Sequence, residues 1–327
     1  MNTQKLKDNN YDIILVVPSP FTDPPHPEGG PSTHTYIIRD IFVQLNSVLL
    51  DSGLNSTVMD MGSWSANVSC GISVGVGGDK PSTGRGRITG QIMRHQKKTG
   101  NRHIVVDRGY IYKRLEYWSV GWDDLNGRAN FCNQNMDNSR INDWGIKLKP
   151  WKTNDGGFVL FCLQLPWDAA VNYTNYPAYV KNTVDTLLLS TNREIVLREH
   201  PLISMGRCSQ LPIAHKHRDV VDNLVDYRVK NDRVRMSKNS SIEDDFDQAW
   251  CVVAYNSNST VDATLQGVPS FVADEGSMTW NISRRDLDIE NPINPDRYQW
   301  LCDLSYTQWS NDELSKGLPF KQLGVIL

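Results

Sequence analysis

The sequence predicts an α/β protein built from two Rossmann-like halves, each with a mainly parallel sheet. Short continuous apolar runs, typical of strands buried on both faces, alternate with segments whose apolar residues recur at helical spacing. The order of strand, loop and helix occurs in both halves of the chain. Strands separated by helices favour parallel pairing with right-handed crossovers, and 327 residues are enough for two such domains.

The first half opens with a strand, a glycine-bearing loop and a helix. The apolar run 13–17 predicts the strand, and apolar residues at helical spacing over 36–49 predict the helix. The intervening loop is rich in Pro and Gly, and its Gly29 and Gly30 would let a ligand approach the backbone closely. His34 follows these glycines at the start of the helix, so we consider it a candidate base.

A second buried strand is predicted at 104–106 and is followed directly by polar residues. Asp107 and Arg108 stand at its carboxyl end, the edge at which open α/β sheets bind ligands. Asp107 is the first candidate for a general base. A structural aspartate, which caps the following turn or pairs with Arg108, is an equally good interpretation of this position. Arg128 lies in a polar, turn-rich stretch and is a candidate for facing a substrate.

The strand and helix pattern restarts in the second half, after a turn rich in Asn, Asp and Gly. A helix is predicted over 176–189, and a terminal helix over 297–317 that packs back across the junction. By contrast, 71–87 is rich in Gly, Ser and Thr and predicts a mobile loop. The strands of the second half are predicted at 158–163, 194–197, 251–254 and 270–273.

The segment 255–269 combines a strand end, a hydroxyl-rich turn and a short helix. Such a turn directs backbone N–H groups and the positive end of a helix dipole at one point, which suits a phosphate. Ordinary N-capping by Ser and Asn is the structural alternative. The candidate ligand-binding residues of this segment are Ser257, Asn258, Ser259, Thr260 and Asp262.

Two further polar motifs follow predicted strands of the second half. Arg198 and His200 come directly after the strand at 194–197, and Gln164 and Asp168 follow the strand at 158–163. A lone histidine in this place is often only a hydrogen-bonded structural residue. The carboxyl ends of parallel strands meet at one edge of the sheet, so we expect these motifs and the hydroxyl-rich turn to converge on one ligand.

The order and spacing of these motifs resemble the capsule-polysaccharide and Kdo-transferase-like group of GT-B glycosyltransferases, over 158–273. The resemblance implies a GT-B-like fold with a cleft between two Rossmann-like domains, and a nucleotide sugar as donor. It also implies that His200 and the hydroxyl-rich turn hold the donor phosphates. The chain departs from the group's usual pattern at Arg198, where lysine is common, and at Asp262, where glutamate is common; both keep the charge.

Three other segments, at 107–110, 125–128 and 300–317, are similar to glycosyltransferases of tailed bacteriophages. This similarity implies a phage origin and an acceptor such as DNA carrying hydroxymethylated pyrimidines, with a glycan as the other acceptor class. The predicted domains are 1–152 on the acceptor side, 153–295 on the donor side, and 296–327 as the returning C-terminal segment.

Composition limits the cofactors and the location that we expect. The six cysteines include no Cys-x-x-Cys pair, and no Asp-x-Asp motif stands in a suitable context, so we predict free thiols, no metal and no cofactor besides the nucleotide sugar. A formal net charge of −3 gives no global basic footprint for nucleic acid. With a polar N-terminus and no apolar run long enough to span a bilayer, we expect a cytoplasmic protein.

Two other functions are compatible with these motifs. A sugar-nucleotide epimerase would use the same phosphate site without a second substrate, and a non-catalytic protein would bind a nucleotide, a glycan or nucleic acid without turnover.

Overall fold

The computed structural model describes residues 10–18, 33–65, 68–79, 84–153, 156–171, 175–204 and 231–327. It divides the chain into two compact units, of which the first contains 1–125, 129–140 and 302–327. The second unit contains 126–128 and 141–301. Compared with the predicted limits at 152 and 295, residues 141–152 and 296–301 lie with the second unit, and 302–327 lie with the first.

The first unit has a six-stranded sheet with the order β11-β5-β4-β3-β1-β2. Strands β1 to β4 are parallel, and β5 and β11 are antiparallel to their neighbours. The strands are β1 (Tyr11–Val17), β2 (Ser56–Asp60), β3 (Cys70–Val76), β4 (Arg102–Arg108), β5 (Tyr117–Trp122) and β11 (Gln308–Ser310).

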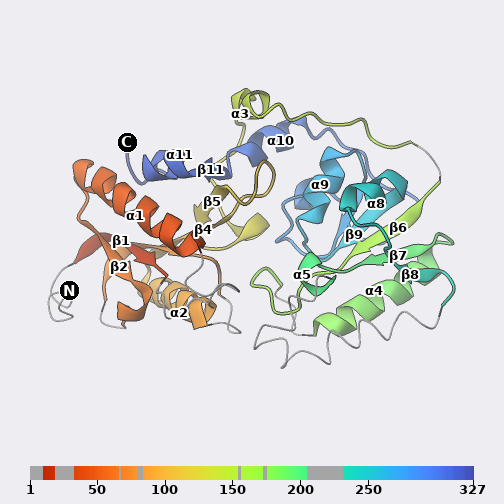
Figure 1. Ribbon diagram of the computed structural model, residues 1–327, viewed down its shortest axis with the longest axis horizontal. Helices are drawn as coiled ribbons and strands as arrows, with labels where there is room; N and C mark the ends of the chain where they lie inside the picture. Colours follow the sequence, from red (N-terminus) through yellow and green to blue (C-terminus); the bar gives the residue numbers. More distant parts are fainter. Residues whose placement is uncertain are drawn as a thin grey trace. The chain divides into compact units, whose positions relative to one another are not determined.

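Helices cover both faces of this sheet, with α1 on one face and α2 on the other (Figure 1). Strand β1 is apolar from Ile13 to Val17 because its alternate residues enter two cores. Leu15 packs on the side of α1, and Val16 packs on the side of α2. The helices are α1 (Thr33–Asp51), α2 (Gly84–Thr99), α11 (Asn311–Ser315) and α12 (Leu318–Gln322), with the short 3-10 helix η1 (Met61–Ser63).

The second unit has a five-stranded, entirely parallel sheet with the order β10-β9-β6-β7-β8. Its first strand, β6, lies in the centre, so the direction of winding reverses between β6 and β9. The strands are β6 (Phe158–Cys162), β7 (Ile195–Arg198), β8 (Val234–Met236), β9 (Ala249–Ala254) and β10 (Ser270–Val272).

In the second unit, α4 packs on one face of the sheet, and α8 and α9 pack on the other. Phe161 of β6 points to the α4 core, and its neighbour Leu160 points to the core with α8 and α9. The helices are α4 (Tyr176–Ser190), α5 (Pro201–Ser204), α8 (Ile242–Gln248) and α9 (Ser259–Leu265), with η2 (Asn126–Arg128) and η5 (Trp280–Ile282). Two further helices, α3 (Ser139–Asp143) and α10 (Tyr298–Ser305), run across the limits between the units.

The predicted α/β class with two Rossmann-like sheets is confirmed, and two local predictions are wrong. The segment predicted as a mobile loop at 71–87 contains most of β3, which lies inside the first sheet between β1 and β4. The predicted terminal helix over 297–317 is instead α10, then the edge strand β11, then α11. The helix is interrupted because Trp309 is buried in β11, where it pairs with Trp118 of β5. Among the described residues, no helix is long and apolar enough to cross a membrane.

Candidate functional site

Two loops at the carboxyl edge of the second sheet are joined by a reciprocal amide pair. Gln164 follows β6, and its Nε2 donates to Oδ1 of Asn256 at 2.8 Å. The backbone N–H of Asn256, which follows β9, donates to Oε1 of Gln164 at 3.0 Å. Since β6 and β9 flank the point where the winding reverses, this pair fixes the loops at the usual ligand position of an open α/β sheet.

Asp274, which follows β10, extends this network along the edge. Its Oδ1 accepts from Nδ2 of Asn256 at 2.8 Å and from the N–H of Gly276 at 2.9 Å, and its Oδ2 accepts from Tyr255 Oη at 3.0 Å. The same carboxylate forms an ion pair with Arg128, and both side chains are largely buried. Arg128 was predicted to face a substrate from the first half, whereas it belongs to the second unit and neutralises Asp274.

The segment carrying Arg128 reaches this position because of one glycine. The N–H of Gly127 donates to the carbonyl oxygen of Gly276 at 3.0 Å. A Cβ at Gly127 would lie 2.5 Å from the carbonyl oxygens of both Glu275 and Ser277, closer than any side chain can approach. Only glycine therefore permits this close backbone contact at the edge of the sheet.

The hydroxyl-rich turn lies beside the amide pair, and its backbone is more engaged than predicted. The N–H of Ser259 donates to Ser257 Oγ at 3.3 Å, and the N–H of Thr260 donates to the carbonyl oxygen of Ser257 at 3.1 Å. The N–H of Val261 donates to the carbonyl oxygen of Asn258 at 3.0 Å. The prediction that this turn offers free N–H groups is therefore wrong for these three residues. Its hydroxyls at Ser257 and Ser259 are partly exposed and stay candidates for binding a ligand.

Thr260 differs from the two serines, since it is fully buried. Its hydroxyl donates to the carbonyl oxygen of Ser257 at 2.8 Å and accepts from Thr279 Oγ1 at 3.0 Å. A hydroxyl has a single proton to donate, so this side chain cannot also donate to a ligand. The predicted contact between Thr260 and a donor phosphate is corrected to a structural contact that holds the start of α9.

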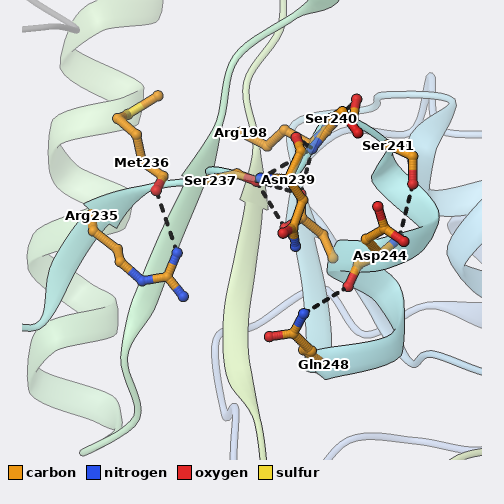
Figure 2. A network of polar contacts seen from close by, with 10 residues as sticks. Arg198, Arg235, Met236, Ser237, Asn239, Ser240, Ser241, Asp244 and Gln248 are labelled. Carbon is orange, nitrogen blue, oxygen red and sulfur yellow. Dashed lines mark hydrogen bonds and ion pairs between the residues drawn. The ribbon is translucent and has the colours of Figure 1, made fainter.

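Arg198, at the end of β7, lies in a dense polar network with the loop between β8 and α8 (Figure 2). Its guanidinium contacts Oδ2 of Asp245 at 2.5 Å and donates to the backbone oxygens of Asn239 at 3.1 Å and Ser240 at 3.2 Å. Asp245 is buried and also accepts from Ser237 Oγ at 2.7 and 2.8 Å. These contacts give Arg198 a structural function at the edge where it was predicted to bind a donor.

Cys162, at the end of β6, marks the centre of this edge. In the sheet it pairs with Arg198 on one side and Ala254 on the other, and its thiol is hydrogen-bonded to the side chain of Ser259. Burial raises the pKa of the Cys162 thiol to about 12, so the group stays neutral. Asp262, in the first turn of α9, is near enough to Cys162 to act on the same pKa.

Two other predicted residues also lie at this edge and are partly exposed. His200 follows β7 and immediately precedes α5, where its carbonyl oxygen accepts from the N–H of Ile203 at 2.8 Å. Asp168 lies in the turn after β6, and its Oδ1 accepts from the N–H of Ala170 at 3.0 Å. The structure thus places all the motifs predicted for the donor side on one edge of one sheet.

Two candidates of the first half, Asp107 and Arg108, stand at the end of β4. Asp107 is half-buried near the end of β4 and pairs in the sheet with Ser119. Arg108 donates to the carbonyl oxygen of Leu115 at 2.8 Å, and its guanidinium lies 5.7 Å from the ring centre of Trp118. His34 lies in the first turn of α1 with its side chain outside the described residues; Gly29 and Gly30 also lie outside them.

Sequence reasoning missed Asn256, Asp274 and Asp245 as parts of the site. Asn256 and Asp274 each follow a predicted strand, so the rule that selected Gln164 and Arg198 would have found them. Asp245 lies inside α8 and gives no comparable signal. Within the described ranges, no group of three or more His, Cys, Asp or Glu side chains could hold a metal ion.

Comparison with known proteins supports the class of fold. No family model matches the chain, and no curated protein matches its sequence. Thermosulfurimonas dismutans KpsC, beta Kdo 2,4 transferase, is similar in structure with a TM-score of 0.50 and 11% identity, over 93% of this chain and 98% of that one. The chain is therefore a mixed α/β protein with a GT-B-like fold.

Two other solved structures are similar at lower scores. The beta Kdo 2,7 transferase of Thermosulfurimonas dismutans KpsC has a TM-score of 0.48 and 11% identity, over 96% of this chain and 99% of that one. The UDP-GlcNAc 2-epimerase of Methanocaldococcus jannaschii, in complex with UDP-GlcNAc and UDP, has a TM-score of 0.29 and 10% identity, over 81% and 83% of the two chains.

Proposed function

We propose that the chain is a glycosyltransferase that moves a sugar from a nucleotide-sugar donor to a hydroxyl group of an acceptor. The observation that supports this most is the convergence of Gln164, His200, Asn256 and the Ser257–Ser259 turn at the carboxyl edge of β6, β7 and β9. The fold shared with a Kdo transferase is consistent with the proposal.

On the donor side, we propose that Ser257, Ser259 and His200 bind the diphosphate. Both hydroxyls are partly exposed at the start of α9, whose dipole favours negative charge. Ser259 Oγ donates to Ser257 Oγ at 2.9 Å, which leaves the proton of Ser257 for a phosphate, and an exposed hydroxyl such as that of Ser259 can also rotate toward the ligand. Gln164 and Asn256 hold the two loops in place, as described, and Asp168 and Asp262 are proposed to bind sugar or ribose hydroxyls. Bond cleavage leaves negative charge on the departing nucleotide, which these donors would stabilise.

On the acceptor side, we propose Asp107 as the general base. Its carboxylate takes the proton of the acceptor hydroxyl, whose oxygen bonds to the anomeric carbon while the bond from that carbon to the donor phosphate oxygen breaks. The proposed acceptor is a hydroxymethylated pyrimidine in DNA, with a glycan hydroxyl as the alternative to be tested in parallel.

The donor site is tested by His200→Ala and Ser259→Ala, each measured for nucleotide-sugar affinity by calorimetry. Loss of a charge-assisted phosphate contact should cost about 1.5 to 3 kcal/mol, which is roughly a tenfold to 150-fold weaker Kd. The control is Thr186→Ala, which removes an exposed hydroxyl on α4 and should leave the affinity unchanged. Unchanged donor affinity in both site variants would refute the phosphate assignment.

The base is tested by Asp107→Asn, which keeps the volume of the side chain and cannot accept the proton. We expect donor affinity to survive while turnover falls by roughly 10² to 10⁴. A purely structural aspartate would instead lower the melting temperature, with activity following the folded fraction. Near-normal turnover of a stable variant would remove Asp107 from the mechanism and move the assignment to His34.

A panel of nucleotide sugars, incubated with and without hydroxymethylated DNA or glycan acceptors, tests the reaction itself. A transferase releases nucleotide in an acceptor-dependent manner. Release of an altered sugar nucleotide without any acceptor would identify an epimerase, and binding without turnover of any donor would identify a non-catalytic protein.

A further inference from the structure

Helix α2 of the first unit carries an unusual concentration of one charge. Five of its residues are Arg or Lys and none is Asp or Glu. The whole chain has a formal charge of −3, so removing the +5 of this helix leaves −8 for all other residues. This helix therefore has a net positive charge, whereas the remaining residues together are acidic, as in proteins that bind a polyanion locally.

The cations of α2 form a line along its outer face. At 3.6 residues per turn, Arg87, Gln91, Arg94 and Lys98 fall on one stripe, and all four are exposed. The opposite side of the helix is packed on the sheet through the buried residues Thr89, Ile92 and Gln96. Lys97 is exposed at the margin of the same stripe. Figure 1 shows α2 covering one face of the first sheet, so this stripe faces outward from that layer.

The positions of these charges affect the helix in opposite ways. Arg87 stands in the first turn, where the helix dipole disfavours positive charge, whereas Lys97 and Lys98 stand in the last turn, where it favours positive charge. Arg94 and Lys98 are four residues apart and repel each other. Among the residues that the structure describes, Asp79 forms an ion pair with Arg94 of this helix. Helix stability therefore accounts for Lys97 and Lys98 but not for Arg87, and an anionic ligand would account for all of them.

We propose that this basic stripe (Arg87, Arg94, Lys97 and Lys98) binds the phosphate backbone of double-stranded DNA. The stripe from Arg87 to Lys98 is about 16 Å long, from the rise of 1.5 Å per residue, and so covers about five base pairs. The helix contains no Phe, Trp or Tyr on which unpaired bases would stack, which favours a duplex over a single strand. It also has no exposed large apolar residue among those described, so it lacks the anchor of an interfacial membrane helix.

The inference rests on the proposed function and adds to it the surface that holds the acceptor. Because α2 follows β3, its first turn lies toward the carboxyl edge of the first sheet. Asp107 stands at the same edge, at the end of β4. Successive side chains of a strand point to opposite faces, and Val106 packs in the core on the side of α1, so Asp107 is on the face that α2 covers. The proposed base and helix α2 thus lie on the same face of the first sheet.

The test is the affinity of the intact protein for a fluorescent 20-base-pair duplex, measured by anisotropy between 50 and 200 mM salt without any donor. Since Arg94 is already paired with Asp79, Arg87, Lys97 and Lys98 should neutralise three phosphates. The slope of log K against log salt should then be about −2.7, so that affinity falls by roughly 40-fold over this range. The double variant Arg87→Gln/Lys98→Gln should bind more weakly, with a slope of about −0.9 and a fall of roughly 3.5-fold. The control Lys147→Gln/Lys321→Gln removes the same charge from exposed positions outside α2 and should retain the original slope.

Circular dichroism and the melting temperature establish that the double variant is folded. An unchanged slope in the folded double variant would overturn the proposal, as would tighter binding to a uronic acid polysaccharide or to phosphatidylserine vesicles at the same salt. The proposed function and the proposed DNA-binding surface would be refuted by different results. Duplex binding by the stripe without any sugar transfer would refute the transferase and leave this surface standing, whereas sugar transfer to a glycan without duplex binding would do the reverse.

Discussion

Replacing Asp245 by alanine should destabilise the second unit strongly, because it would leave the guanidinium of Arg198 without its carboxylate. Asp245 is 1% exposed and the Arg198 side chain is 16% exposed, so water can replace little of what is lost. Removing one partner of a buried ion pair costs about 3 to 5 kcal/mol. The variant also strands the hydroxyl of Ser237 and the amide of Asn239, which both donate to Asp245, so we expect a value toward the upper end.

The assay is denaturant unfolding of the intact chain, followed by tryptophan fluorescence and by circular dichroism. Asp247→Ala is the matched control, since Asp247 is exposed on the same helix and its removal should change stability by less than about 0.5 kcal/mol. A double variant, Arg198→Met/Asp245→Leu, should recover much of the loss because no charge is left buried. A loss below about 1 kcal/mol for Asp245→Ala would show that the network does not hold this edge of the sheet.

Three other predictions address groups elsewhere in the chain. Burial lowers the pKa of His103 to about 4, whereas the imidazole of the unfolded chain has a pKa near 6.5, so the unfolded state binds a proton more readily than the folded state. The free energy of unfolding should therefore fall by up to about 3 kcal/mol as the pH drops from 6.5 to 4. A His103→Gln variant with the same pH dependence would contradict this. Gly127→Ala should lower the free energy of unfolding by about 1 to 3 kcal/mol, measured by thermal unfolding. Gly156→Ala should be nearly neutral, because a Cβ there meets no atom within 4 Å. Equal effects of the two substitutions would argue against the close backbone contact at Gly127. In native protein at pH 8, iodoacetamide should label the exposed Cys132 and spare Cys162, whose pKa burial raises to about 12; peptide mass mapping that found both labelled would contradict this burial.

The strands that could be predicted from the sequence are those with an uninterrupted apolar run. Strands β1, β4, β6 and β9 each contain a run of at least three successive apolar residues, because the middle of each strand is buried on both faces. Strand β3 is equally central but contains Gly71, Ser73 and Gly75, which weaken a strand signal. The reason is its neighbour His103: Ser73 shares a 2.7 Å hydrogen bond with the imidazole, and a Cβ at Gly75 would lie 3.0 Å from the ring.

The edge that carries the site could be predicted, whereas the function of each side chain there could not. Polar residues after a strand mark the carboxyl edge whatever they contact, so Gln164 and Arg198 were found by position alone. The partners of Arg198 come from residues 237–245, which follow a different strand. Local sequence spacing does not encode such partners, and for the same reason the burial of Thr260 could not be anticipated.

The two units of this chain alternate along the sequence, and this limits how either unit can be exchanged between proteins. The chain passes from one unit to the other after residues 125, 128, 140 and 301, so no single cut of the chain separates the two units. A fragment limited to 153–295 would lack Arg128 and leave the largely buried carboxylate of Asp274 without its cation. The remaining N-terminal fragment would lack β11 and expose the edge of β5 to pairing with other chains. Recombination between relatives of this fold should therefore preserve function only when the short segment at 126–128 travels with the second unit and the C-terminal residues travel with the first.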